Sequence, residues 1–428
     1  MRFYKETNFK DTEIGRIPKE WEVVKVDKLF DLYKGTTPST KVEEYWNGTI
    51  PFVTPTDITK INDVSEMYLK TTENYITEEG LKSKGLKLIP EDSLLLTSRA
   101  TIGYLAINKV KVAINQGVIS LKPRNQDTNV IFFYYLLQNF RDFFESLAGG
   151  STYKEISMST FSDVKVLHPS LSEQKKIAEI ISTIDKAIQK ANEIIAKTER
   201  LKKGLMEELL TKGIGHKEFK DTEIGRIPKE WEVVRLGDKN VSILVKSGST
   251  PLKGQKEYWN GNIPFVTQSD MTKVDRYLYE TYEKITEIGL KSSNLILIPK
   301  NSILLSMYGT IGKVVINKNP VAVSQNIAAI ILNKKYVDHE YLFYAIQKYS
   351  SQFKKQAKII TLKHLDIQIV KNMLLPFPSP KEQQKIAEIL STVDKKLEIE
   401  RKQKEKLERI KRGMMDLLLT GKIRVKVD

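Results

Sequence analysis

The side chains that usually carry catalysis or bind metals are sparse in this chain and form no recognisable site. The sequence contains no cysteine, so disulfides and thiolate chemistry are excluded. Its four histidines (His168, His216, His339 and His364) lack the spacing of metal ligands, and the carboxylates form no pair suited to acid–base work. The sequence has neither a GxxxxGK[ST] phosphate loop nor a GxGxxG fingerprint. We therefore expect no catalytic residue and no metal site.

The chain is instead built as two copies of one unit. Residues 9–24, FKDTEIGRIPKEWEVV, recur letter for letter at 219–234. The likeness continues more loosely, with 34–59 matching 246–272 and 76–108 matching 285–317. Such a duplication has to be recognised before a fold is assigned. Positions that are equal in both copies are expected to serve the fold, whereas positions that differ inside matching loops are candidates for specific contacts.

The charge of the chain indicates what those contacts would meet. Lysine and arginine total 69 against 53 acidic residues, which gives a formal net charge of +16, and the excess is spread along the chain. Neutralising phosphates supplies most of the non-specific affinity of proteins for DNA. The charge therefore favours DNA as a partner, although a lysine-rich chain whose excess charge is simply solvated is the alternative.

Loops that differ between the copies carry side chains able to read bases. Arg99 stands opposite Tyr308, the segment 55–56 opposite 268–269, 115–117 opposite 324–326, and 39–41 opposite 252–254. Arginine can hold guanine through two donors, and glutamine or asparagine can hold adenine likewise. The base-contacting candidates are Lys41, Thr56, Arg99, Gln116, Lys253, Gln268, Tyr308 and Gln325.

Shared threonines and lysines are better suited to phosphates, which position a protein without reading sequence. These candidates are Thr36, Thr152, Lys154, Thr250, Thr361 and Lys363. Local roles remain open for several of the loop residues: Arg99 and Tyr308 as turn residues, and Gln116 and Gln325 as partners of their own backbone. The four tryptophans (Trp21, Trp46, Trp231 and Trp259) are expected in the core rather than stacked on bases.

Each copy is followed by a long helix that must position it. Residues 172–211 contain no proline, and apolar residues recur at alternating spacings of three and four, as in a coiled-coil seam. Ser172, followed by Glu173 and Gln174, is a credible helix start. A helix of this length spans about 60 Å and needs a partner to bury its stripe. Residues 381–420 repeat the pattern, with QKKIAEIISTIDK at 174–186 matching QQKIAEILSTVDK at 383–395.

The order of these segments predicts the architecture. Short apolar runs bounded by Gly, Pro and Asn read as strands, and the aromatic-rich stretches 130–147 and 338–356 as helices packed on a sheet. We expect two α+β domains, at 1–170 and 213–379, with a long helix at 171–212 and, at 380–428, a second long helix with a C-terminal tail; the helical segments themselves are 172–211 and 381–420. Because the second domain begins where one helix ends and ends where the other begins, the helices should be antiparallel, in a pseudo-two-fold arrangement. Exchange of helices between two molecules is the alternative.

Neither a membrane span nor a secretory signal is expected. No run of about 18 apolar residues occurs, and the start of the chain, MRFYKETNFKDTEIG, is polar. The lack of cysteine suits a reducing compartment or a hot habitat. We expect a cytoplasmic protein.

The organisation resembles the specificity (S) subunit of type I restriction–modification systems. The resemblance covers essentially the whole chain and rests on five pairs of motifs in the same order, each weak alone. They are GRIPKEW (15–21, 225–231), GTTP and GSTP (35–38, 248–251), IPFVTPTD and IPFVTQSD (50–57, 263–270), SRATIG and YGTIG (98–103, 308–312), and EQKKIAEI and EQQKIAEI (173–180, 382–389).

The resemblance implies that each globular domain is a target recognition domain that reads half of a bipartite double-stranded DNA site. The helices would set the gap and dock modification (M) subunits, which use S-adenosylmethionine to methylate adenine. Restriction (R) subunits would join them and use ATP and Mg²⁺. The chain itself would hold no cofactor and catalyse nothing, and it lacks the Asn-Pro-Pro-aromatic motif of adenine methylation. The alternatives are a free-standing bipartite DNA-binding regulator, or a scaffold whose charge is incidental.

Overall fold

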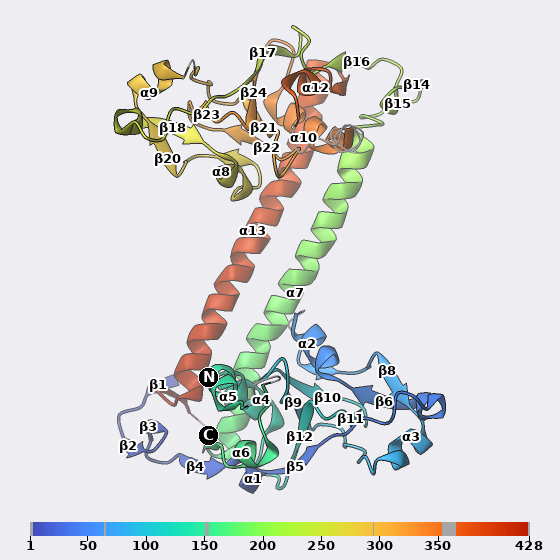
Figure 1. The fold of residues 1–428 in the computed structure, drawn as a ribbon, viewed down its shortest axis with the longest axis vertical. Coiled ribbons are helices and arrows are strands. Elements are labelled where there is room, and N and C mark those ends of the chain that lie inside the picture. The colour runs from blue at the N-terminus through green and yellow to red at the C-terminus, as the bar shows by residue number, and fades with distance from the viewer. Residues whose placement is uncertain (1–2, 64–65, 150–153, 294, 353–364, 427–428) are drawn as a thin grey trace. The chain divides into compact units, whose positions relative to one another are not determined.

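The computed structural model describes residues 3–63, 66–149, 154–293, 295–352 and 365–426, and the chain divides into two compact units (Figure 1). The first unit comprises Met1–Ile194 and Glu400–Asp428, and the second comprises Ile195–Ile399. Each unit therefore contains one globular repeat together with a part of both long helices.

Two sheets form the centre of the first unit among the described residues. The larger sheet has the order β5-β12-β9-β10-β7 and the smaller has the order β11-β6-β8. The strands of the larger sheet are β5 (Phe30–Lys34), β12 (Val118–Pro123), β9 (Leu94–Thr97), β10 (Leu105–Asn108) and β7 (Tyr68–Leu69). Those of the smaller sheet are β11 (Ala113–Ile114), β6 (Trp46–Val53) and β8 (Asn74–Ile76).

The second unit repeats both sheets with the same strand order. Its larger sheet is β17-β24-β21-β22-β19 and its smaller sheet is β20-β18-β23. The larger sheet contains β17 (Ser242–Ser247), β24 (Ile327–Leu332), β21 (Ile303–Ser306), β22 (Val314–Asn317) and β19 (Tyr277–Leu278). The smaller contains β20 (Glu283–Ile285), β18 (Trp259–Val266) and β23 (Ala322–Val323). The duplication predicted from sequence is thus a duplication of fold.

The central strands are apolar except for their last residue, because both of their faces are covered. All four residues of β9 and of β10 are buried, as are all four of β21 and of β22. Helices cover the larger sheets: α4 (Val130–Gln138) in the first unit and α10 (His339–Tyr349) in the second. Side chains of α4 and α10 join the main hydrophobic cluster of their units. This accounts for the aromatic-rich stretches that were expected to pack as helices.

Short helices and two-stranded sheets complete each unit. In the first unit they are β2 (Phe9–Thr12) with β3 (Gly15–Pro18), β4 (Glu22–Lys25) with β13 (Lys165–His168), and α1 (Val26–Leu29), η1 (Glu43–Tyr45), α2 (Pro55–Asp63), α3 (Glu78–Ser83), α5 (Arg141–Leu147) and α6 (Met158–Ser162). In the second they are β14 (Phe219–Thr222) with β15 (Gly225–Pro228), β16 (Glu232–Arg235) with β25 (Leu374–Phe377), and η2 (Lys256–Tyr258), α8 (Gln268–Thr272), α9 (Glu287–Ser292) and α12 (Ile367–Lys371).

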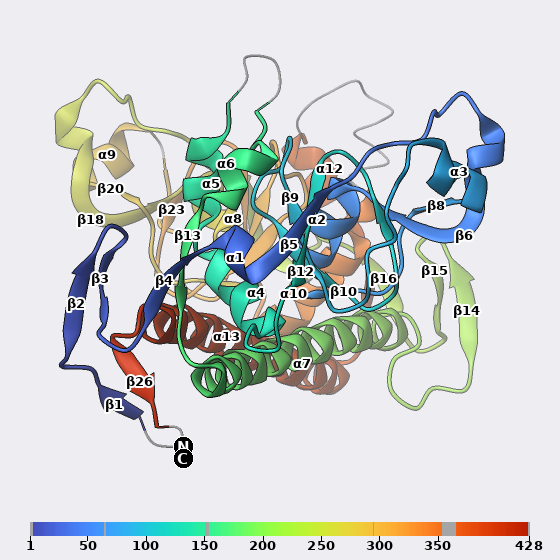
Figure 2. The same ribbon diagram turned by 90° about the horizontal axis from the view of Figure 1, so that it is seen from below.

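The first unit also joins the two ends of the chain. Strand β1 (Phe3–Lys5) pairs antiparallel with β26 (Ile423–Val425), so that Tyr4 lies opposite Arg424. Figure 2 shows this pair next to the marked termini. The C-terminal tail thus returns to the first domain, as the pseudo-two-fold arrangement requires.

The two long helices are α7 (Leu171–Leu209) and α13 (Pro380–Leu419), within two residues of the predicted bounds. In the first unit Asp185 of α7 pairs with Lys411 at 2.7 Å, and Glu173 pairs with Arg424, just beyond α13, at 2.6 Å. In the second unit Lys202 pairs with Asp394 at 2.6 Å. Because residue numbers rise on one helix as they fall on the other, the helices run antiparallel, as expected.

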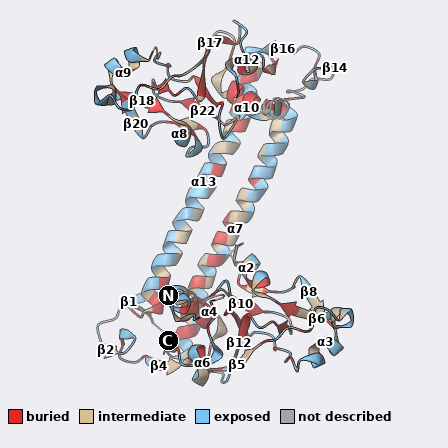
Figure 3. Ribbon diagram, in the orientation of Figure 1, coloured by how far each residue is buried: buried red, intermediate tan, exposed pale blue. Residues whose placement is uncertain are grey.

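Each long helix buries the residues that pack into the core of a globular domain. Ile177 and Ile181 of α7 are fully buried in the core of the first unit, and Ile386 and Leu390 of α13 in that of the second. Residues 400–406 of α13 are mostly exposed and charged (Figure 3). In the described part of the chain, no helix is long and apolar enough to cross a membrane.

Candidate nucleic-acid interface

The loops that carry the predicted contact residues meet in the first unit, although they are far apart in sequence. Ser98 donates its backbone N–H to Gly117 O at 2.8 Å and accepts one from Ile156 at 2.9 Å. The Asn115 N–H donates to Val53 O at 3.0 Å, just before α2. The loop at 35–41 joins them through Gly35, where a Cβ would lie 1.9 Å from Ile114 O, so that only glycine fits. Arg99, Gln116 and Thr56 are thereby brought to one region.

The second unit assembles the equivalent loops. The Met307 N–H donates to Asn326 O at 2.8 Å, and Leu365 N–H donates to Met307 O at 2.8 Å. Gly248 takes the place of Gly35, with a Cβ position 1.8 Å from Val323 O. The Gln268 Nε2 donates to the Thr310 hydroxyl at 3.1 Å, which joins α8 to the loop that carries Tyr308. Tyr308, Gln268 and Gln325 are thus neighbours in space.

A threonine–glutamine pair occurs at the same place in both clusters. The Thr37 hydroxyl donates to Gln116 Oε1, and the Thr250 hydroxyl donates to Gln325 Oε1. Both glutamines are exposed. The counterpart of Thr250 is therefore Thr37, as the alignment of GTTP with GSTP also gives; the predicted Thr36 aligns with Ser249. Since each amide oxygen accepts this bond, each glutamine presents its NH₂ group as a donor.

The turn after β9 and β21 has the same backbone shape with different side chains. Ala100 has φ of +66° and Gly309 has φ of +63°, a left-handed conformation that is strained for alanine. Arg99 is half-buried and its backbone bridges to Glu155, whereas Tyr308 is 45% exposed. The Ala100 N–H donates to the backbone oxygen of Lys154, whose side chain is exposed.

The remaining candidates lie around these turns or outside the described residues. Thr36, Lys41 and Thr56 are exposed. Lys253 lies 4.0 Å over the ring of Trp259 and pairs with Glu283. Thr152, Thr361 and Lys363 lie outside the described residues.

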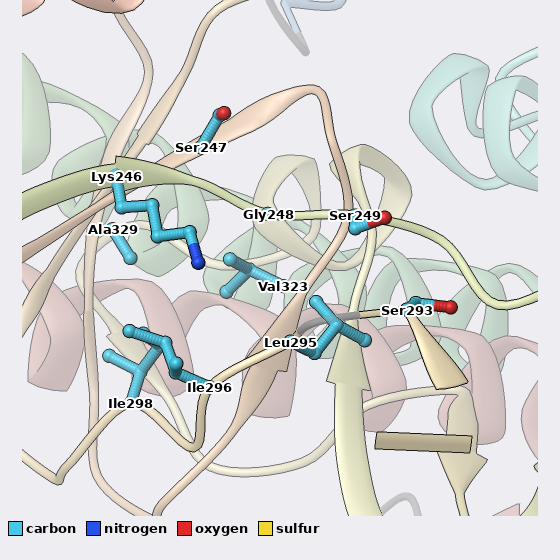
Figure 4. Close-up of a pocket in the computed structure, with 10 residues that line it drawn as sticks. All are labelled: Lys246, Ser247, Gly248, Ser249, Ser293, Leu295, Ile296, Ile298, Val323 and Ala329. Carbon is cyan, nitrogen blue, oxygen red and sulfur yellow. The ribbon is translucent and has the colours of Figure 1, made fainter. Parts of the chain in front are cut away.

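A small cavity of about 190 Å³ lies under the 248–254 loop of the second unit (Figure 4). Its floor is apolar, formed by Leu295, Ile296, Ile298, Val323 and Ala329. Lys246 points into it from β17, while the hydroxyls of Ser247 and Ser249 point away (Figure 4). In the first unit the position of Lys246 belongs to Tyr33, whose hydroxyl accepts the Lys87 N–H at 3.1 Å. The two clusters thus differ beneath their loops as well as on them.

Repeated side-chain bonds fix each domain to its long helix. Trp21 Nε1 donates to Glu173 and Trp231 Nε1 donates to Glu382, each at 3.0 Å, and both tryptophans are in the core as predicted. Trp46 and Trp259 are only half-buried. Gln174 at the start of α7 accepts the Asn129 N–H at 2.8 Å and donates to the backbone oxygens of Asp127 and Pro169.

Gln383 at the start of α13 repeats these bonds, accepting the Asp338 N–H at 3.0 Å. Its Nε2 donates to the backbone oxygens of Tyr336 and Pro378. Glu173 and Gln174 were predicted only as part of a helix start. Their hydrogen bonds to the globular domain were not predicted. The signal available was the recurrence of Glu-Gln in both repeats.

A tyrosine–aspartate–lysine cluster forms a second anchor in each unit. The Tyr135 hydroxyl donates to Asp185 at 2.7 Å, and Lys411 pairs with the same carboxylate. Tyr344, Asp394 and Lys202 repeat it, with a 2.6 Å bond from Tyr344. Burial is the first cause that raises the pKa of both tyrosines, so they stay protonated and donate.

Among the residues that the structure describes, no group of three or more histidine and carboxylate side chains is placed to hold a metal ion. What the fold presents is two copies of one exposed loop cluster, with polar side chains that differ between the copies. This arrangement defines a duplicated recognition protein.

Comparison with known proteins identifies the class. The family described as "Type I restriction modification DNA specificity domain" matches residues 18–200 and again 228–409, and the chain belongs to this family. It is thus a DNA specificity subunit with two target recognition domains, the non-catalytic component of a type I restriction–modification system.

Individual relatives agree with this assignment. The MjaIX type I restriction enzyme specificity subunit of Methanocaldococcus jannaschii is 31% identical over 439 residues, covering 99% of this chain and 98% of the relative. The MjaVIII subunit of the same organism is 30% identical and covers 100% and 98%. The crystal structure of a type I restriction–modification S subunit from M. genitalium shares the fold, with a TM-score of 0.60 at 16% identity over 93% of this chain and 96% of that one.

Proposed function

We propose that each unit binds one half of a bipartite double-stranded DNA target through its own loop cluster. The observation that carries the proposal is the pairing of the clusters: the backbone bonds are repeated, whereas the exposed side chains differ. Two copies of one reader that had to recognise the same bases would have no need to differ at Arg99 and Tyr308. The net charge of +16 supports a polyanionic partner.

Different side chains in the clusters take different roles. Arg99 and Gln116 read base edges in the first unit, and Gln268, Tyr308 and Gln325 do so in the second. Gln116 and Gln325 act as donors, because each amide oxygen already accepts a threonine hydroxyl. A donor can meet N7 or O6 of guanine, N7 of adenine or O4 of thymine, and the second lone pair of the amide oxygen also allows bidentate reading of adenine.

The threonines and lysines contact phosphates and set the register on the duplex. They are Thr36, Thr152 and Lys154 in the first half, and Thr250, Thr361 and Lys363 in the second. Lys41, Thr56 and Lys253, in loops that differ between the copies, stay candidates for base contacts. Exposure supports this role for Thr36 and Lys154, whereas Thr250 is half-buried and its hydroxyl donates to Gln325. The pairing of Lys253 with Glu283 reduces its charge toward DNA.

The long helices set the unread gap and dock M subunits, and R subunits join the assembly. S-adenosylmethionine, ATP and Mg²⁺ would be bound by those partners rather than by this chain. Support comes from the exposed charged segment 400–406 of α13, and from a 15% identical structure with a TM-score of 0.57 whose title concerns complex assembly of the type I restriction–modification system. We place the complex in the cytoplasm.

Footprinting on a duplex selected from a random library tests the proposal. We expect two short protected blocks with an indifferent gap, and an affinity that falls steeply as salt is raised. A continuous protected block, or affinity indifferent to salt, would contradict it. Tight binding without any M subunit would favour the free-standing regulator instead.

A further inference from the structure

An open cleft of about 510 Å³ lies beside the loop cluster of the first unit. Its lining comes from the 35–41 loop, from β6 and β8, and from the turn that carries Gln116. The lining includes Thr37, Thr40, Trp46, Asn74, Tyr75, Asn115 and Gln116. The volume falls in the range of small-molecule binding sites.

A bulge in strand β6 holds the aromatic side of the cleft in place. The register between β6 and β8 shifts between Trp46 and Ile50, and Asn47 has φ of +60°, which asparagine tolerates. The Trp46 Nε1 donates to Ser39 O at 3.0 Å, and its ring meets Phe52 edge to face at 5.5 Å. The indole is therefore fixed and half-exposed at the cleft.

The chemistry of the lining indicates a neutral, planar ligand. All ten lining residues are uncharged, so the cleft offers no cation to a phosphate. Asn115 Oδ1 accepts the Gly117 N–H at 2.9 Å, and Gln116 Oε1 accepts the Thr37 hydroxyl, so both amides present NH₂ donors. Aromatic rings beside amide and hydroxyl groups are what a protein uses to hold an unstacked base.

The second unit fills the same place with an ion pair. Lys253 corresponds to Thr40 and Glu283 to Asn74, because Trp46 and Trp259 begin equivalent strands and Phe52 and Phe265 pair with Asn74 and Glu283. Lys253 lies over the Trp259 ring at 4.0 Å and pairs with Glu283. The indole face that is available in the first unit is covered here.

We propose that the cleft of the first unit binds one unpaired nucleobase, stacked on Trp46 and hydrogen-bonded by Asn74, Asn115 and Gln116. The second unit does not, because Lys253 and Glu283 occupy the equivalent place. This inference rests on the proposed function, since the base comes from the DNA that the adjoining loops hold. It makes the two half-sites unequal: one is read with a base drawn out of the duplex, the other as an intact duplex.

The test uses the full chain with Trp259→Phe, so that Trp46 is the exposed tryptophan reporter; Trp21 and Trp231 are each 1% exposed. Single-stranded tetranucleotides of adenine, cytosine or thymine are titrated while tryptophan fluorescence is followed. We expect saturable quenching. The double variant Thr40→Lys with Asn74→Glu should weaken this binding roughly 5- to 150-fold, the range expected for losing one base–aromatic stack.

This variant leaves the net charge unchanged and copies an ion pair that the second unit already holds over its own tryptophan. The reverse variant, Lys253→Thr with Glu283→Asn in the chain that keeps Trp259, should add tetranucleotide binding to the second unit; this arm remains decisive if the first variant misfolds. Absence of quenching, or equal affinity in the Trp259→Phe chain with and without the Thr40 and Asn74 changes, overturns the inference. Duplex binding measured in parallel with M subunits present separates the two proposals: if the unaltered chain gives no duplex binding under these conditions, the proposed function is refuted instead.

Discussion

The two units keep the same attachments to the long helices but differ inside one interior site. Trp21 with Glu173 and Trp231 with Glu382 are the same bond made twice, and so are the Tyr135–Asp185 and Tyr344–Asp394 bonds. The side chains next to the tyrosine–aspartate bond differ between the two units. The two copies therefore share the hydrogen bonds that attach each domain to its long helix. The side chains packed next to these bonds differ between the copies.

At this interior site the second unit has an ion pair, whereas the first unit has hydrophobic packing. In the second unit Arg276, with 9% of its side chain exposed, pairs with Glu340 and lies 3.6 Å from Asp394. The equivalent residues of the first unit are Met67 and Ile131, which pack in its hydrophobic core. Both solutions support the same tyrosine–aspartate–lysine cluster. The charged one depends on complete pairing, since a buried charge without its partner is costly.

The largest effect is expected from breaking this pair. Arg276→Met should lower the free energy of unfolding by about 3–5 kcal/mol, because it removes the buried guanidinium that pairs with Glu340 and lies near Asp394. Adding Glu340→Ile copies the first unit at both positions and should restore most or all of the loss, since apolar replacement of a buried pair is often neutral or stabilising. Denaturant unfolding of both variants measures this. If the double variant is as unstable as the single one, the apolar pair of the first unit cannot replace the ion pair of the second.

A second difference concerns the residue that bonds the anchoring glutamate. Gly421 and Gly213 both have positive φ and lie against Trp21 and Trp231, and three residues later come Arg424 and His216. Arg424, 7% exposed in its side chain, pairs with Glu173, Glu6 and Glu20, whereas His216 approaches Glu382 at 2.9 Å. In the first unit, therefore, the ion pairs of Arg424 attach strand β26 to the domain.

Arg424→Ala should destabilise the first unit by about 3–5 kcal/mol, because Glu173 is 2% exposed and loses its counter-charge. His216→Ala should cost only about 1–2 kcal/mol in the second, because Glu382 still accepts from Trp231 Nε1 and from the Ile214 N–H. Hydrogen exchange resolved by unit distinguishes the two. Equal losses would indicate that the histidine and the arginine do the same work.

Acid should act on the second unit in a way that the first cannot show. Burial alone would raise the pKa of Glu340, but hydrogen bonds from His339 and Tyr277 and the charge of Arg276 outweigh it and lower the pKa from 4.5 to about 2. A lowered pKa in the folded state stabilises it fully above about pH 4.5, and this contribution is lost as the pH falls towards 2.

The loss from Glu340 over that window is about 3 kcal/mol. Glu340→Gln removes the titration, so the difference in unfolding free energy between wild type and variant should shrink by about 2 kcal/mol between pH 5 and pH 2.5, with the rest lost at lower pH, while unrelated acid effects cancel. Thermal unfolding of both proteins across the range provides the measurement. A difference that stays constant with pH would contradict the assignment.

The smallest effects are expected in the loops. Arg99→Ala and Tyr308→Ala should each weaken binding to the preferred target by about 1–3 kcal/mol and relax the preference at one position of one half-site. Selection from a random duplex library with each variant measures this. An Arg99 variant that alters both half-sites would show that the clusters are not independent readers.

The sequence revealed those parts of the fold whose signals are local or repeated. The long helices follow from an apolar spacing within each segment, and the duplication from 16 identical letters. The bonds of Glu173 and Gln174 were not predicted, because Trp21 and Asn129 are distant in the chain and leave no local pattern. The burial of Arg276 was hidden for the same reason, since it depends on Glu340 and Asp394.

The candidate site was predictable only as a set of loops. Internal comparison found the positions that differ, but it placed the shared threonine at Thr36, whereas the hydroxyl that meets Gln116 belongs to Thr37. The alignment of GTTP with GSTP already places Thr37, not Thr36, opposite Thr250, so this error did not need the structure to be found. By contrast, Lys253 was assigned to DNA although it covers Trp259, because a contact between a cation and a ring across a loop has no sequence signature.

Mapping of methylated bases in a host that carries this chain with its methyltransferase partner tests most directly whether each unit reads its own half-site. We predict one motif made of two short blocks separated by an unread gap. Replacing residues 98–103 with 307–312 should change one block and leave the other intact. An uninterrupted motif, or a replacement that alters both blocks, would contradict the proposal that two separate readers share this chain.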